Sequence, residues 1–264
     1  RQARRARAFW DASYKDAVGD SEGVHDSPSS SSIHTEWIVS PTEVLRHLPR
    51  LHRHPRIRVL EIGCGDSLLG EAIYDHLSRL ANDRRELGGM QGTTTTNPER
   101  HVSVVCTDIS PVAIERLVAR QEKEDSERRR RPGLEYLVAD ATDLPAFFEF
   151  TNDGDGRLLF DIVVDKGCAD TFQFRAKTNE SDGLLRRLFR SVHTALRPGG
   201  AYLVITPRKK VKHLRSWHWD SDVLTTAKGD ASKCRTGLGW ALQRRHDLGV
   251  LDSGELKKKS TTKK

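Results

Sequence analysis

Glycine and ionisable residues recur in this sequence where apolar, β-strand-like runs end. These runs are Ile57–Ile62, Val102–Thr107, Leu134–Val138 and Leu158–Val164. The residues that follow them closely are, in the same order, Gly63 with Gly65, Asp108, Asp140, and Asp165 with Lys166. Parallel strands place their carboxyl ends along one edge of a sheet, and ligands bind at that edge. We therefore expect these residues to form one site.

The turn Gly63-Cys64-Gly65 allows a sharp bend and a close approach of the backbone to a ligand. The helix expected after it would direct its N–H groups toward that ligand. A dinucleotide fingerprint needs its third glycine at position 68, where the chain has Leu68. The spacing therefore argues against a pyrophosphate cradle, and hence against NAD or FAD.

Three later strand ends carry groups that suit an adenosyl ligand. Asp108 can accept hydrogen bonds from two ribose hydroxyls, although capping a helix near Ser110 explains it equally well. Asp140 can bind an exocyclic amine, while the N–H of Ala141 can donate to a ring nitrogen. Two adjacent charges that end an apolar strand, as in Asp165-Lys166, are hard to explain as packing. Together the strand ends favour an adenosyl-binding site.

Strand-like and helix-like segments alternate along the chain, which predicts an α/β fold with helices on both faces of a mostly parallel sheet. Helices are expected to begin at a Ser40 capping box, at Ser110-Pro111, and at Ser181 or Asp182. Arg197–Gly200 is expected to be a turn before a fifth strand. Three further strands are predicted at Ala201–Thr206, Trp219–Thr226 and Gly239–Arg245. They bring the sheet to seven strands, of which the last is antiparallel. Loops are predicted at 27–32, 82–100 and 152–157.

The chain carries 44 basic and 37 acidic residues, a formal net charge of +7. Four arginines fall in residues 1–8 and five lysines in residues 257–264, so the part between these segments is slightly acidic. This predicts a basic leader (1–8), one domain (9–250) and a lysine-rich tail (251–264). Since the excess positive charge lies in the two end segments, a nucleic-acid partner is not expected.

Compartment and metal content follow from other residue types. No apolar run approaches the roughly 20 residues of a membrane span. The four cysteines are widely spaced, which gives neither a zinc motif nor a disulfide framework and favours a reducing compartment. We expect no metal and a cytoplasmic location. Mitochondria are the alternative if the arginine-rich start is a remnant of a transit peptide.

The runs VLEIGCGDS, CTDIS, VADATDLP, FDIVVDKGCAD and ALRPGGAYLVIT resemble the successive motifs of class I, seven-β-strand, S-adenosylmethionine-dependent methyltransferases. The D-K-G at 165–167 resembles, more narrowly, the methyltransferase-like protein lysine methyltransferases that modify elongation factor 1-alpha and citrate synthase. Trp10-Asp11-Ala12-Ser13-Tyr14 and Glu36-Trp37-Ile38 match that group too. The group continues D-K-G-T-x-D-A, whereas here Cys168, Ala169, Asp170 and Thr171 follow Gly167. The resemblance covers about residues 9–210.

The resemblance implies a Rossmann-like seven-stranded sheet and S-adenosyl-L-methionine as cofactor. Glu61 would lie near the amino group of the cofactor, Asp108 would hold the ribose, and Ile109 would pack on the adenine. Asp140 and Ala141 would recognise the adenine edge. The full set of cofactor-binding residues that it implies is Trp10, Tyr14, Trp37, Glu61, Gly63, Cys64, Gly65, Asp108, Ile109, Asp140, Ala141 and Lys166.

A methyltransferase must mainly align donor and nucleophile and exclude water. A lysine nucleophile must be neutral when it attacks, and a nearby carboxylate can first bind its ammonium form. The catalytic candidates are Asp165 and Asp170, which we expect beside the channel that admits the acceptor side chain. Three functions remain open: a protein lysine methyltransferase, a methyltransferase acting on a small molecule or RNA, and a non-catalytic adenosyl-binding scaffold. The first is favoured, with a protein that carries the target lysine as partner. Lys-Gly-Cys after Asp165 replaces the prolines and aromatic residue expected for planar amine substrates.

Overall fold

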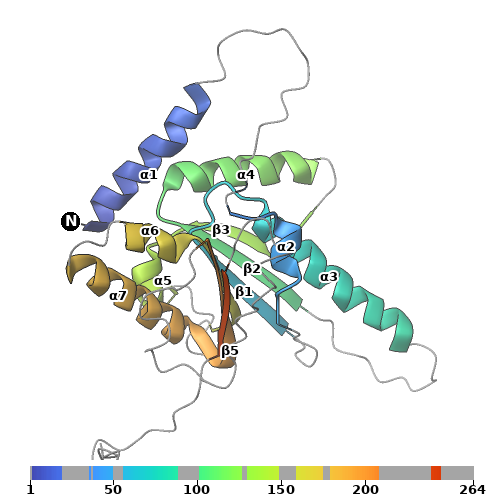
Figure 1. Cartoon of the computed structure of the whole chain (residues 1–264). Coiled ribbons are helices and arrows are strands. Elements are labelled where there is room, and N and C mark those ends of the chain that lie inside the picture. The colour runs from blue at the N-terminus through green and yellow to red at the C-terminus, as the bar shows by residue number, and fades with distance from the viewer. Residues whose placement is uncertain are drawn as a thin grey trace, which may run out of the picture.

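A computed structural model describes residues 2–19, 36, 38–49, 56–88, 101–126, 130–148, 159–174, 179–207 and 239–244. Its centre is a six-stranded sheet in the order β3-β2-β1-β4-β5-β6 (Figure 1). The strands are β1 (Arg56–Ile62), β2 (His101–Asp108), β3 (Leu134–Val138), β4 (Phe160–Lys166), β5 (Leu196–Thr206) and β6 (Gly239–Arg244). The first five are parallel, and β6 runs antiparallel to β5.

This arrangement confirms the predicted Rossmann-like α/β sheet and its antiparallel last strand. Chain order reverses at β1, which lies between β2 and β4, so the switch point of the sheet adjoins the loop after β1. The strand predicted at Trp219–Thr226 lies outside the described residues.

Helices cover both faces of the sheet (Figure 1). They are α1 (Gln2–Gly19), α2 (Pro41–Leu45), α3 (Leu69–Gly88), α4 (Pro111–Ser126), η1 (Ala141–Asp143), α5 (Leu144–Phe148), α6 (Cys168–Phe174) and α7 (Asn179–Ala195). Side chains of α2, α3 and α4 form one core with the sheet, while α5, α6 and α7 form a second core on its other face. Residues alternate between the two: Val59 joins the first core, and Leu60 joins the second.

Several predicted boundaries are wrong. Strand β5 begins at Leu196, not Ala201, because Leu196 already pairs with Phe160 and the expected turn is an irregularity within the strand. Helix α3 continues through the first part of the loop expected at 82–100, because that part is rich in helix-forming residues and ends at Gly88. Helix α7 begins at Asn179.

One expectation about a helix start also differs from the structure. The side chain of Ser40 makes no capping hydrogen bond, and the backbone carbonyl of Ser40 instead accepts from the N–H of Val44 at 3.4 Å. Helix α1 runs without a break across the expected boundary between leader and domain at residue 9. Among the described residues, no helix is long and apolar enough to span a membrane.

Close packing of α3 on the sheet depends on Gly70. A Cβ at this position would lie 2.2 Å from Cys106 Sγ and 3.2 Å from Glu61 Oε2. Within a helix, replacing glycine with alanine normally stabilises the helix by up to about 1 kcal/mol. Here we expect Gly70→Ala to destabilise the protein by about 1–2 kcal/mol through overpacking. Chemical denaturation measures this. Adding Cys106→Ala should restore part of the loss, and a stabilised single variant would contradict the packing described.

Candidate active site

The loop between β1 and α3 is bent by two glycines with left-handed backbones, Gly63 (φ 61°) and Gly65 (φ 57°). A Cβ on Gly63 would lie 2.8 Å from the Cβ of Cys168, so α6 packs directly against the loop. Buried Cys64 donates its N–H to the carbonyl of Thr107 at 3.0 Å and thus continues the pairing of β1 with β2. The loop therefore lies against the ends of the neighbouring strands, as predicted.

Asp108 at the end of β2 ties two loops together. Its carboxylate accepts the N–H of Gly65 at 3.0 Å and the N–H of Ser110 at 2.8 Å. Burial raises the pKa of this carboxyl, an effect that these backbone hydrogen bonds oppose. The side chain that faces the first turn of α4 is that of Ser110, whose hydroxyl oxygen accepts a long hydrogen bond from the N–H of Ala113 at 3.4 Å. Asp108 thus fixes the glycine loop to the end of β2.

Helix α1 covers this loop with Tyr14. A Cβ on Gly65 would lie 2.7 Å from the Tyr14 hydroxyl, so only glycine leaves room for that ring. Burial, and then the charges of Asp108 and Asp66, raise the pKa of Tyr14, which keeps the hydroxyl protonated. Trp10 is half-buried one turn earlier, with its ring 6.2 Å from that of Tyr14.

Two polar contacts attach α1 to α4 and the residue before it. Ser110 Oγ donates to Asp11 Oδ1 at 2.5 Å, and the guanidinium of Arg116 donates to the carbonyl of Tyr14. Within the W-D-x-x-Y motif, Tyr14 therefore contacts the glycine loop, Trp10 lies beside Tyr14, and Asp11 anchors the helix.

Lys166, at the end of β4, joins a polar cluster at the start of α3. Its ammonium donates to Glu36 and, at 3.0 Å, to Ser67 Oγ. Glu36 Oε1 also accepts the N–H of Leu68 at 2.9 Å. Only 4% of the Lys166 side chain is exposed, against 20% for Glu36. Glu36 was not among the predicted site residues, although it precedes the predicted Trp37, which lies outside the described residues.

Glu61 is a carboxyl buried beneath the loop, and 1% of the residue is exposed. Cys106 Sγ donates to its Oε2 at 3.3 Å, whereas Oε1 accepts no hydrogen bond within the described part of the chain. Burial raises the pKa of Glu61 to about 8, and the nearby charge of Lys166 opposes that rise. A buried oxygen without a donor fits a ligand that brings one, such as an amino group.

The end of β3 lies beside the end of β2, since the N–H of Ala139 donates to the carbonyl of Asp108 at 2.9 Å. Asp140 caps η1: its Oδ1 accepts from both the N–H and the hydroxyl of Thr142 at 2.8 Å. Ala141 is buried and Ile109 is half-buried. The three residues predicted to surround an adenine therefore follow adjacent strands.

The sequence predicted Asp165 and Asp170 at the mouth of a channel for the acceptor lysine, but both carboxylates are buried. Asp165 is 0% exposed and accepts the Tyr202 hydroxyl at 2.6 Å and the N–H of Ala169 at 3.1 Å. Asp170 is 1% exposed and accepts from Thr206 Oγ1 at 2.8 Å. The pleat explains the error, because consecutive strand residues point to opposite faces. Lys166 reaches α3, while Asp165 points into the core beneath α6 and α7.

Over part of its length the chain resembles a curated protein. The mitochondrial citrate synthase-lysine N-methyltransferase of Danio rerio is 28% identical over 149 residues, which make up 56% of this chain and 46% of that protein. The chain thus spans less than half the length of that relative. The chain therefore combines a Rossmann-like α/β sheet and a glycine loop with sequence similarity to a methyltransferase.

S-Adenosyl-L-methionine is the cofactor of the class I methyltransferases. Solved structures similar to this chain include a complex of the Haloferax volcanii Trm112 methyltransferase activator with a putative methyltransferase (16% identity, TM-score 0.40, 76% of this chain and 60% of that one). Another is the glycopeptide N-methyltransferase MtfA with sinefungin (18% identity, TM-score 0.38, 65% of this chain and 52% of that one). No family model matches the chain.

The pair of Glu36 and Lys166 can be tested by a double-mutant cycle. Glu36→Gln leaves a buried ammonium without its counter-charge, and Lys166→Met leaves Glu36 without its strongest donor. We expect each single variant to lose about 1–2 kcal/mol of stability and the coupling to be on the order of 1 kcal/mol. Denaturant unfolding of all four proteins measures both. Additive losses would mean that the two side chains do not interact.

Proposed function

We propose that this protein transfers a methyl group from S-adenosyl-L-methionine to a lysine side chain of a protein substrate. The observation that carries the proposal is the gathering of the glycine loop, Asp108, Glu61 and Tyr14 at the switch point of a class I sheet. The D-K-G motif and the similarity to a lysine methyltransferase favour the lysine acceptor.

The residues present fit the cofactor. Glu61 Oε1 is a buried acceptor that the amino group of a methionine moiety would satisfy, and Lys166 supplies a positive charge for its carboxylate. Asp108 suits the ribose hydroxyls, while Asp140 and Ala141 suit the adenine. The left-handed Gly63 and Gly65 leave the space that a side chain would otherwise fill.

The cofactor would supply a methyl group on a sulfonium, so that the lone pair of the lysine nitrogen forms the new bond and the carbon–sulfur electrons stay on sulfur. The protein has to hold donor and acceptor in line and keep water out. Trp10 and Tyr14 on α1 close the site above the loop. Neither Asp165 nor Asp170 is exposed to receive the proton that the lysine must lose, so we propose solvent as its acceptor.

Incubation with radiolabelled S-adenosylmethionine and a cell lysate tests the proposal. We expect the label in protein, at lysine after hydrolysis, and we expect a variant without residues 257–264 to act equally well. Label in RNA or in small molecules would retain the methyltransferase and overturn its substrate class. Cofactor binding without any transfer would leave an adenosyl-binding scaffold.

A further inference from the structure

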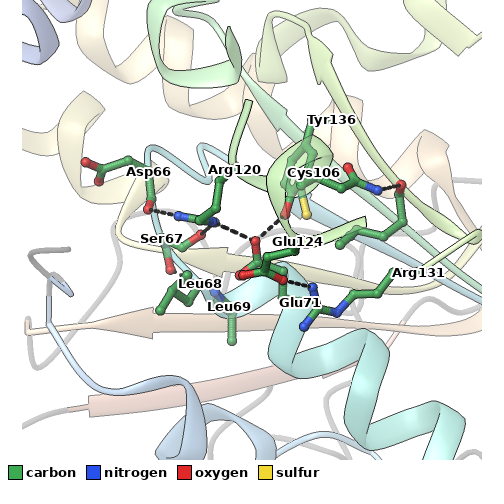
Figure 2. A network of polar contacts seen from close by, with 12 residues as sticks. Asp66, Ser67, Leu68, Leu69, Glu71, Cys106, Arg120, Glu124, Arg131 and Tyr136 are labelled. Carbon is green, nitrogen blue, oxygen red and sulfur yellow. Dashed lines mark hydrogen bonds and ion pairs between the residues drawn. The ribbon is translucent and has the colours of Figure 1, made fainter. Parts of the chain in front are cut away.

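Arg120 on α4 reaches across to the carbonyl groups at the end of the glycine loop. Its guanidinium donates to the carbonyls of Asp66 and Ser67, each at 3.3 Å (Figure 2). Asp66 and Ser67 are the third and second residues before Leu69, where α3 begins. No motif in the sequence points to Arg120, because its partners are more than 45 positions away.

The contact with Ser67 determines where the next N–H points. The carbonyl of Ser67 and the N–H of Leu68 belong to one planar trans peptide, so they point in opposite directions. Arg120 holds the carbonyl on the α4 side, and the N–H of Leu68 therefore points to the other side, where Glu36 accepts it at 2.9 Å. Glu36 in turn pairs with Lys166.

Arg120 is itself held rigidly. Glu71 Oε1 accepts from Arg120 Nη2 at 2.6 Å and from Nε at 2.9 Å, and also from the Tyr136 hydroxyl at 2.9 Å. Glu71 is 5% exposed, and 15% of the Arg120 side chain is exposed. A guanidinium that binds a carboxylate along one edge still has N–H groups on its other edges that can donate to carbonyls. A lysine ammonium cannot reproduce this planar arrangement.

We propose that Arg120 is a positioning residue of the cofactor site: it fixes the peptide between Ser67 and Leu68 so that its N–H donates to Glu36, which in turn pairs with Lys166. The inference rests on the proposed function for its link to the cofactor. The orientation of the peptide between Ser67 and Leu68 does not depend on that function.

Arg131 provides a matched control. It follows α4 and pairs with Glu124 on α4 at 2.5 Å (Figure 2). It also pairs with Asp75 on α3 at 2.9 Å, so it connects the same two helices. None of the contacts described for it reaches the loop. Arg131→Gln should therefore cost stability as Arg120→Gln does, without moving the peptide at Ser67.

The experiment compares Arg120→Gln, Arg120→Lys and Arg131→Gln with the unchanged protein. We expect Arg120→Gln to weaken S-adenosylmethionine binding about tenfold in calorimetry, the size of one lost hydrogen bond. KM for the cofactor should rise more than kcat falls. Arg120→Lys should retain most of the stability but share the weak binding, and Arg131→Gln should bind as the unchanged protein does.

Amide hydrogen exchange gives a readout that needs no cofactor. The N–H of Leu68 should exchange faster in Arg120→Gln and at the original rate in Arg131→Gln. Equal exchange at Leu68 in both variants, or equal loss of affinity in both, would overturn the inference. If the unchanged protein binds the cofactor and Arg120→Gln binds it equally well, the inference fails and the proposed function stands. Failure of the unchanged protein to bind would overturn the proposed function, and the exchange at Leu68 would still decide the orientation of the peptide.

Discussion

Replacing Asp108 with asparagine should weaken S-adenosylmethionine binding by about 30- to 150-fold, or roughly 2–3 kcal/mol. The negative charge that strengthens hydrogen bonds to ribose hydroxyls is lost. In addition, the carboxylate accepts two backbone N–H groups, from Gly65 and Ser110, and an amide has only one oxygen to offer them. The glycine loop therefore loses its attachment to the end of β2 together with the ribose contact.

Calorimetry of cofactor binding is the direct measurement. Because Asp108 is buried and accepts two backbone N–H groups, the substitution should also lower the stability of the protein. The NH2 group of the buried asparagine would face one of the backbone N–H groups that Asp108 now accepts. Two donors facing each other should cost about 1–3 kcal/mol of stability. Arg131→Gln therefore serves as a control with lower stability and an unchanged site. An affinity equal to that of the unchanged protein would place the ribose elsewhere.

Local sequence patterns were sufficient to predict the sheet. Apolar runs such as Val102–Thr107 are strands because they are buried on both faces, and each is followed by a residue type that suits the edge. Boundaries were less predictable. Pairing of Leu196 with Phe160 extends β5 through Pro198 and Gly199, two residues that by themselves indicate a turn.

The location of a candidate site residue could be predicted where its position along a strand determines that location, and it was missed where a distant side chain determines it. Asp108 and the glycines lie at the predicted edge because strand ends place them there. The contact between Glu36 and Lys166 joins residues 130 positions apart, and no local pattern reveals it. Asp165 was misplaced for a different reason: strand alternation separates it from Lys166, although the two are adjacent in sequence.

The buried carboxyl of Asp165 should make stability depend on pH. Burial raises its pKa from 3.8 to about 7, against the opposing effect of the hydrogen bond from Tyr202. Between these values the folded protein holds a proton that the unfolded chain has released. The stabilisation is therefore complete below about pH 3.8 and is lost as the pH rises to about 7. A shift of this size corresponds to roughly 4 kcal/mol.

Asp165→Asn should remove this dependence, because the amide stays neutral at every pH and its oxygen still accepts from the Tyr202 hydroxyl. We expect the variant to gain stability relative to the unchanged protein as the pH rises from 4 to 8, with most of the change below about pH 7. Urea unfolding at each pH measures the difference, and Asp143→Asn, at an exposed carboxylate, controls for the substitution itself. Glu61→Gln should show the same trend up to about pH 8, where the raised pKa of Glu61 lies. A constant difference between Asp165→Asn and the unchanged protein would mean that Asp165 is charged in the folded state throughout this range, with its charge compensated inside the core.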